Sequence, residues 1–141
     1  MYPLENRLTI MGRLDEIARA RDFVTAIARE AGLNEKSVHH CSLAVDETCT
    51  NIIEHGYQLQ GHDKSIEIIC QVESLNFIIR IRDDGPAFNP LLRTDPNPNA
   101  PLEEREHGGW GIYFVKEFMD QVLYSRDGNY NQLTMSKSIT R

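Results

Sequence analysis

The segment from Leu43 to Tyr57 constrains the fold and function of this chain more than any other segment. Glu47, Asn51 and His55 lie four residues apart, and four helical residues turn through about 400°, so these side chains form one slowly drifting ridge. The other side of the same predicted helix carries an apolar stripe, made of Val38, Cys41, Val45, Cys49, Ile52 and Ile53. A carboxylate, an amide and an imidazole on one ridge are either a solvated helix face or a functional row.

The composition is that of an ordinary globular protein, and we expect one domain over residues 1–141. The formal net charge of -6 argues against a direct nucleic-acid partner, whose binding surface is normally basic. No apolar run approaches the roughly 20 residues of a membrane span, and the N-terminus lacks the pattern of a signal peptide. The three cysteines lie inside periodic segments, which predicts buried thiols in a reducing compartment and therefore a cytoplasmic protein without a membrane partner.

The remaining periodicity predicts the order of helices and strands. Helices are expected over residues 13–31, 35–56 and about 112–119, with Gly32 ending the first and Asn34 capping the second. Strands are expected at residues 5–11, 65–73, 77–82, 121–125 and 130–139, the last two joined by a turn at residues 127–129. Because short turns join most of these strands, we predict an α+β two-layer sandwich, with a mostly antiparallel mixed sheet covered on one face by helices.

Asp83, Asp84 and Gly85 follow a predicted strand and form the first glycine-marked segment after the long helix. A carboxylate at this place can accept a hydrogen bond from an exocyclic amine, and Gly85 would let a flat ring approach the backbone. The alternative is a plain strand-to-turn transition, where Asp-Gly is common.

The second glycine-marked segment contains Gly108, Gly109 and Gly111 directly before a predicted helix. Exposed N–H groups at a helix start form an anion site, although a flexible hinge is the alternative reading. Five of the six prolines lie between Pro86 and Pro101, which predicts a long functional or mobile loop between the two glycine segments. The histidines and cysteines have no C-x-x-C or H-E-x-x-H spacing, so we do not expect a zinc site.

The order of these segments resembles the ATP-binding superfamily of gyrase, histidine kinases and mismatch-repair ATPases: E-x-x-x-N-x-x-x-H on a helix, D-x-G after a strand, a long lid, and G-G-x-G opening a helix. Within it, the short chain is similar to the anti-sigma factor serine/threonine kinases. The segments that carry this similarity are Asn-Ile-Ile-Glu-His-Gly-Tyr, Asp-Asp-Gly-Pro-Ala-Phe-Asn-Pro and Phe-Met-Asp. The resemblance extends over roughly residues 5–138 and places an ATP lid at about residues 86–111.

This resemblance implies a role for each matching residue. Asn51 matches the ligand of the Mg²⁺ that bridges the ATP phosphates, and an amide oxygen suits this hard cation. Glu47 matches the general base that acts on the acceptor serine, and Asp83 matches the carboxylate that binds adenine. The nucleotide-contacting set would further include His55, Gly85, Ala87, Arg105, Gly108, Gly109 and Gly111.

Three of these matches leave alternatives open. Ala87 stands where the D-x-G-x-G box has its second glycine, so one methyl group narrows the adenine side. Arg105 either neutralises transferred charge, as cations do in phosphoryl transfer, or is a solvated lid residue. His55 either contacts the phosphates or makes a structural hydrogen bond.

The resemblance implies an anti-sigma factor that binds Mg-ATP and phosphorylates a serine or threonine of a small antagonist protein. Such a protein holds a sigma factor, or a substitute target, and releases it when the antagonist is engaged; family members are expected to form homodimers. The alternatives are a nucleotide-binding partner switch without transfer, a histidine kinase-type catalytic domain, and an interaction protein that binds no nucleotide.

Overall fold

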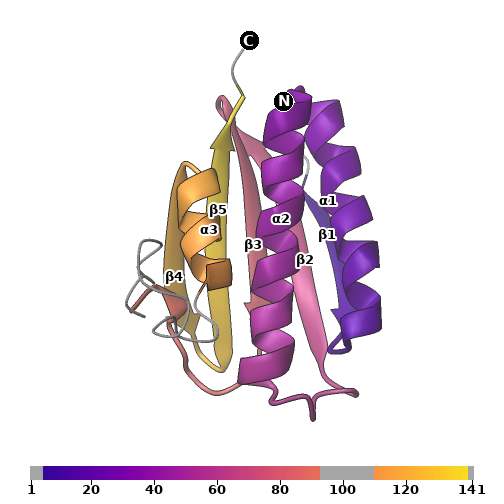
Figure 1. The fold of residues 1–141 in the computed structure, drawn as a ribbon, viewed down its shortest axis with the longest axis vertical. Helices are drawn as coiled ribbons and strands as arrows, with labels where there is room; N and C mark the ends of the chain where they lie inside the picture. The colour runs from indigo at the N-terminus through magenta and orange to yellow at the C-terminus, as the bar shows by residue number, and fades with distance from the viewer. Residues whose placement is uncertain (1–4, 93–109, 140–141) are drawn as a thin grey trace, which may run out of the picture.

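The computed structural model describes residues 5–92 and 110–139, which form a sheet layer and a helix layer (Figure 1). The strands are β1 (Asn6–Met11), β2 (Ser65–Glu73), β3 (Asn76–Asp83), β4 (Gln121–Asp127) and β5 (Tyr130–Ser138). They form one sheet in the order β1-β2-β3-β5-β4, and each neighbouring pair is antiparallel. The predicted α+β two-layer sandwich is therefore confirmed, although within the described residues the sheet is antiparallel throughout and not mixed.

Three α-helices cover one face of this sheet, α1 (Ile17–Ala31), α2 (Glu35–Asn51) and α3 (Trp110–Phe118) (Figure 1). The first helix was predicted to begin at Arg13, but a 3₁₀ turn at Leu14–Glu16 precedes it. Within that turn, the Glu16 carboxylate accepts a hydrogen bond from the Met11 backbone N–H at 3.1 Å. This contact joins the end of β1 to the start of the helix layer.

The connection between α1 and α2 follows the sequence closely. Gly32 has a φ of +100°, and the Leu33 N–H donates to the Ala28 carbonyl at 3.1 Å, which is the expected left-handed helix end. Asn34 then caps α2, because its Oδ1 accepts the Ser37 N–H at 2.8 Å. The two helices consequently pack side by side over the sheet.

The second helix departs from the prediction at its C-terminal end. The sequence favoured one continuous helix to Gly56, whereas α2 ends at Asn51 and a π-helical turn occupies Ile52–Gly56. The Tyr57 N–H closes this wider turn by donating to the Ile52 carbonyl at 2.7 Å. Turns of this kind are rare and frequently occur at functional sites.

The core lies between the two layers. From the sheet, the alternating residues Phe77, Ile79 and Ile81 of β3 are fully buried against the helices. The predicted buried thiols are confirmed, since Cys41, Cys49 and Cys70 are free and buried, and desolvation raises each thiol pKa to about 12; this holds the thiols protonated.

The β4–β5 hairpin is longer than predicted, because β4 continues to Asp127 and pairs there with Tyr130. Its loop is therefore only Gly128 and Asn129, and Gly128 adopts a φ of +59°. A two-residue loop with positive φ matches the twist of antiparallel strands.

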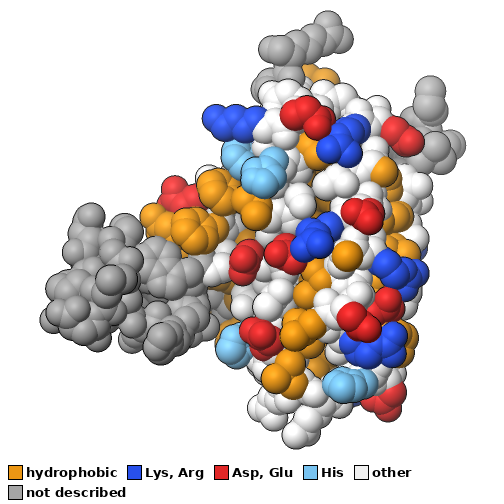
Figure 2. Space-filling view, turned by 45° about the vertical axis from the view of Figure 1, so that its right-hand side comes forward, with side chains coloured by type: hydrophobic (Ala, Val, Ile, Leu, Met, Phe, Trp, Pro, Cys, Tyr) orange, Lys and Arg blue, Asp and Glu red, His pale blue; other side chains and the backbone are white. Residues whose placement is uncertain are grey.

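The outer surface of the helix layer carries acidic and basic side chains next to each other (Figure 2). Arg21 and Asp46 form an ion pair between α1 and α2 at 3.1 Å, and Arg29 pairs with Glu35 at the same distance. No helix in the described part of the chain has both the length and the apolar character needed to cross a membrane.

Candidate functional site

A cavity lies between the C-terminal end of α2, the end of β3 and the start of α3. Its lining residues are Thr48, Asn51, Ile52, Gly56, Ile81, Asp83, Pro86, Phe88, Pro90, Ile112, Tyr124, Asn131 and Leu133. The free space inside is about 40 Å³, far below the several hundred Å³ of a typical ligand pocket. A planar ligand would therefore enter only after part of the wall moves outward, and the Phe88 side chain is the part of that wall that is 47% exposed.

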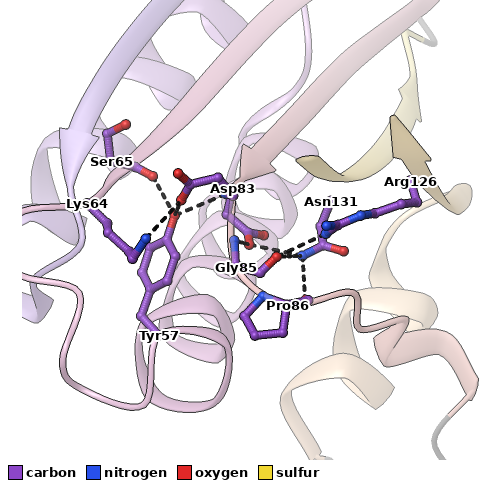
Figure 3. A network of polar contacts seen from close by, with 9 residues as sticks. Tyr57, Lys64, Ser65, Asp83, Gly85, Pro86, Arg126 and Asn131 are labelled. Carbon is purple, nitrogen blue, oxygen red and sulfur yellow. Dashed lines mark hydrogen bonds and ion pairs between the residues drawn. The ribbon is translucent and has the colours of Figure 1, made fainter. Parts of the chain in front are cut away.

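Asp83 is the buried carboxylate of this cavity and is only 7% exposed. Its Oδ1 accepts the Gly85 N–H at 2.9 Å and the Asn131 Nδ2 at 3.1 Å (Figure 3). Burial raises the pKa of Asp83, while these two hydrogen bonds and Arg126 act in the opposite direction. The result is an acceptor group held at the polar end of an otherwise largely apolar cavity.

Asn131 is a site residue that the sequence analysis missed. It lies on β5 directly opposite Asp83 of β3, and it is equally buried. Its Oδ1 accepts hydrogen bonds from the Tyr124 hydroxyl at 2.5 Å and from the Phe88 N–H at 3.3 Å. Asp83 and Asn131 are 48 residues apart, so only the cross-strand register brings them together.

Asn51 lies at the junction of α2 and the π-helical turn and lines the same cavity as Asp83. The ridge predicted for Glu47, Asn51 and His55 does not continue regularly, because a π turn advances each residue by a smaller angle than an α turn. His55 is exposed and lies outside the residues that line the cavity. The structure therefore brings Asn51 and Asp83 together at one cavity and leaves His55 off it.

Glu47 is half-buried one helical turn before Asn51. Burial, followed by the nearby charges of Asp46 and Glu54, raises the pKa of its carboxyl. Gly111 lies against this carboxylate, because a Cβ at position 111 would overlap Oε2 and approach Cδ to 3.1 Å. The first turn of α3 thus packs directly on Glu47.

The helix start differs from the prediction at this contact. The sequence placed Gly111 just before a helix beginning at about Ile112, whereas α3 begins at Trp110 and contains Gly111 in its first turn. This first turn can lie against Glu47 because Gly111 requires no space for a side chain.

The loop after β3 is anchored by Tyr57, which follows the π-helical turn. The Tyr57 hydroxyl lies 2.7 Å from the Ser65 carbonyl oxygen and 3.1 Å from Asp84 Oδ1 (Figure 3). Lys64 approaches the same Asp84 oxygen at 3.9 Å. These contacts fix the chain just before Gly85, which is buried and where an added Cβ would meet Asp83 Oδ1 at 3.0 Å.

The other residues of the predicted nucleotide-contacting set contribute less to the described site. Ala87 is exposed and does not line the cavity, although Pro86 and Phe88 on either side of it do. Arg105, Gly108 and Gly109 lie outside the described residues, as does most of the predicted lid at residues 86–111.

A family model described as a histidine kinase-like ATPase domain matches residues 10–137. The chain belongs to this ATPase domain family. Membership implies that the domain binds ATP, and the cavity offers chemistry that fits a nucleobase: apolar walls from Ile81, Ile112 and Leu133 and a buried carboxylate acceptor, Asp83.

Two curated relatives are protein kinases. The serine-protein kinase RsbW of Bacillus mycoides is 26% identical over 138 residues, covering 95% of this chain and 84% of that protein. The serine/threonine-protein kinase BtrW of Bordetella bronchiseptica is 27% identical over 95 residues, covering 67% of this chain and 66% of that protein, just under two thirds. These similarities relate the ATPase domain to the RsbW-type anti-sigma factor kinases.

Solved structures show the same fold. The crystal structure of the RsbU and RsbW domains of a Mycobacterium tuberculosis protein matches with a TM-score of 0.70 at 14% identity, covering 98% of this chain and 33% of that chain. This chain thus spans about one third of that crystallised chain. The histidine kinase AdeS of Acinetobacter baumannii matches with a TM-score of 0.54 at 16% identity, covering 96% of this chain and 68% of that chain.

Among the described residues, no group of three or more His, Cys, Asp or Glu side chains could hold a metal ion by itself. The Asn51 amide oxygen is nevertheless a suitable single ligand for Mg²⁺, which commonly uses one or two protein oxygens together with substrate phosphates and water.

Proposed function

We propose that this ATPase domain binds Mg-ATP and phosphorylates a serine or threonine of a small antagonist protein in a partner-switching system. It would hold a sigma factor, or a substitute target, and release it when the antagonist is engaged. The supporting observation is that Asn51 and Asp83 line one cavity while Glu47 lies one helical turn away on the same helix. The RsbW and BtrW relatives, which are named as protein kinases, support the same reaction.

The adenine base of ATP would bind at the Asp83 end of the cavity. The carboxylate offers a hydrogen-bond acceptor to an exocyclic amine, and the apolar walls formed by Ile81 and Leu133 exclude water from the ring faces. The buried Gly85 keeps the backbone close to Asp83 without adding a side chain.

The phosphates would extend toward Asn51 at the end of α2, where its amide oxygen would ligate magnesium. Bound Mg²⁺ would supply neutralisation of the phosphate charge, which is the main electrostatic requirement of phosphoryl transfer. Gly108, Gly109, Arg105 and the rest of the lid at about residues 86–111 are proposed to close over this end.

Glu47 would accept the proton of the attacking hydroxyl. A general base works best when its pKa lies near the operating pH, and burial raises the pKa of Glu47 in that direction. Only the ionised carboxylate can accept the proton, so the transfer rate should fall as the pH decreases through this raised pKa. Gly111 allows α3 to cover the carboxylate and limit its exposure to water.

Phosphoryl transfer is tested by incubating the protein with γ-labelled ATP and the antagonist protein of its own organism. We expect Glu47→Gln to retain Mg-ATP binding in calorimetry and to lower label transfer by about 10²- to 10⁴-fold, the usual contribution of a general base. Glu35→Gln is the matched control, since Glu35 lies on the same helix but in an exposed ion pair with Arg29.

The outcomes separate the remaining functions. Nucleotide binding without transfer by the unaltered protein would favour a nucleotide-binding partner switch, and label on a histidine of the protein itself would favour a histidine kinase-type domain. No binding heat with Mg-ATP, in either the unaltered protein or Asn51→Ala, would favour an interaction protein that binds no nucleotide. A homodimer, also expected for this family, is tested separately by sedimentation.

A further inference from the structure

The side-chain amide of Asn131 joins the Asp83 carboxylate to the first residues after β3 (Figure 3). Besides its hydrogen bond to Asp83 Oδ1 at 3.1 Å, Nδ2 lies 2.9 Å from the Pro86 carbonyl oxygen and 3.3 Å from the Gly85 carbonyl oxygen. One buried amide therefore holds both the carboxylate and the backbone that begins the cavity wall.

The two hydrogen bonds that the described residues give to Asp83 both reach Oδ1, from Gly85 and from Asn131. Within the described part of the chain, Oδ2 is thus left as the acceptor for a ligand in the cavity. The terminal torsion of an aspartate is broad, so the side chain alone does not fix the orientation of its carboxylate plane. The Asn131 amide, together with the Gly85 N–H, fixes this orientation by donating to one of the two oxygens.

We propose that Asn131 is a positioning residue that makes the site selective for 6-aminopurine nucleotides, by orienting Asp83 so that its second oxygen accepts the exocyclic amine. This inference rests on the proposed ATP binding and extends it to a residue outside the recognised motifs. A 6-oxopurine places an acceptor where the amine would be, so an oriented carboxylate disfavours it, whereas a carboxylate that can turn or protonate discriminates less.

The charged and titratable groups that face Asp83 are Asp84 in the same loop, Arg126 on β4 and Tyr57 after the π-helical turn. Burial and Asp84 raise the pKa of Asp83, while the Asn131 amide and Arg126 lower it. Loss of the amide should therefore raise the pKa further. Because the ionised carboxylate is the stronger acceptor, ATP binding in such a variant should weaken at a higher pH than in the unaltered protein.

The first test uses Asn131→Leu, which removes the amide and keeps the branched shape. Calorimetry with ATP and with inosine triphosphate, which has a 6-oxo group, is repeated from acidic to neutral pH. We expect ATP affinity at neutral pH to fall by about ten- to one-hundred-fold and the preference for ATP over inosine triphosphate to shrink by about tenfold. The loss of ATP affinity on acidification, the acid limb of the binding profile, should also begin at a higher pH than in the unaltered protein.

The second test uses Asn131→Asp, which keeps the shape and exchanges the donor for a second carboxyl group beside Asp83. When the two facing carboxyl groups share one proton, that proton can replace the amide donor; when both groups are ionised, they repel each other. ATP affinity in this variant should therefore decrease as the pH rises, the reverse of the unaltered protein. This reversal cannot arise from a loss of folding alone when thermal melting shows the variant folded at each pH.

Gln132→Leu is the matched control, because Gln132 is the adjacent amide on β5 and alternation points it to the opposite face of the sheet. Its nucleotide preference and pH profile should equal those of the unaltered protein. If Asn131→Leu does not fold, the pH profile of Asn131→Asp decides the question.

The inference is overturned if both Asn131 variants keep the ATP preference and the acid limb of the unaltered protein. It fails separately from the proposed function when the unaltered protein binds ATP and Asp83→Asn weakens binding, yet the Asn131 variants behave normally. Absence of ATP binding by the unaltered protein overturns both.

Discussion

The neighbouring strands β3 and β5 carry different chemistry in their middle and at one end. In the middle of the pair, Ile79 faces Met135, and both are fully buried in apolar surroundings. Four residues along β3, at its last position, Asp83 faces Asn131 in the same register and on the same side of the sheet. The same pair of strands therefore contributes to the apolar core in its middle and to the polar end of the cavity at its last position.

The difference shows how the fold positions its site without a flexible scaffold. A buried carboxylate reduces stability unless hydrogen bonds compensate for its lost hydration, and Asp83 has such bonds from Gly85 and Asn131. The apolar pairs of the same two strands, such as Ile79 and Met135, supply the packing that holds Asp83 and Asn131 in place. We therefore expect substitutions in these two regions to affect different measurements.

The largest effect on stability should come from the apolar middle of the β3–β5 pair. Ile79→Ala leaves a cavity between the sheet and the helices and should lower the free energy of unfolding by about 2–5 kcal/mol, measured by urea denaturation. ATP affinity per folded molecule should stay unchanged. Ile78→Ala, on the opposite face and half-buried, is the control and should cost less. A loss of ATP affinity without a loss of stability in Ile79→Ala would break the separation of the two regions.

The next largest effect concerns the polar end of the β3–β5 pair and is an effect on ATP affinity. Asp83→Asn removes the carboxylate acceptor and should reduce ATP affinity by about 1.5–3 kcal/mol, measured by calorimetry. Asp127→Asn, exposed on the neighbouring hairpin, should leave affinity unchanged. A large loss of folding stability in Asp83→Asn, with ATP affinity preserved, would mean that Asp83 belongs to the core and not to the site.

The pH dependence of stability sharpens this comparison. The pKa of Asp83 is raised in the folded protein, so its contribution to stability is present at low pH and is lost as the pH rises through the folded pKa. Urea denaturation at several pH values should therefore show Asp83→Asn gaining stability relative to the unaltered protein as the pH rises. A constant difference between the two proteins across this range would contradict the raised pKa.

The smallest effect on stability is expected at His40, a polar residue of α2 that packs against α3. Its ring stacks on Phe118 with centroids 4.7 Å apart, and within the described residues its buried Nδ1 has no hydrogen-bond partner. His40→Phe keeps the stacked ring and should stabilise the protein by about 1 kcal/mol in thermal or urea unfolding. His39→Phe, at the exposed neighbouring position, is the control.

The gain from His40→Phe should grow at acidic pH. Burial lowers the pKa of His40, so its contribution to stability is present above the ordinary histidine pKa and is lost as the pH falls. A gain in stability that is independent of pH would show that His40 titrates normally in the folded protein.

Local chemistry made several parts of this molecule predictable from sequence. The Asn34 cap, the left-handed Gly32 and the bounds of β2 follow from side-chain preferences and alternation within a few residues. The placement of Asn51 and Asp83 at one cavity followed from the family motifs, which record long-range contacts that local propensity cannot.

The features that escaped prediction depend on contacts between distant segments. The π-helical turn at Ile52–Gly56 looks like ordinary helix in sequence, because its hydrogen bonds shift by one residue without a change of composition. Asn131 lies in a strand whose pattern does not distinguish it from Gln132, and only pairing with β3 assigns it to Asp83. The close packing of α3 on Glu47 at Gly111 likewise depends on a contact between segments far apart in the sequence.

The two-residue loop at Gly128 and Asn129 has a consequence for the alignment of β5 with β3. Asn131 is the second residue beyond that loop, so a one-residue slip of β5 past β3 would turn Asn131 to the opposite face of the sheet and bring Gln132 or Tyr130 opposite Asp83. The tight turn at this hairpin tip therefore helps to keep Asn131 beside Asp83, even though neither loop residue lines the cavity.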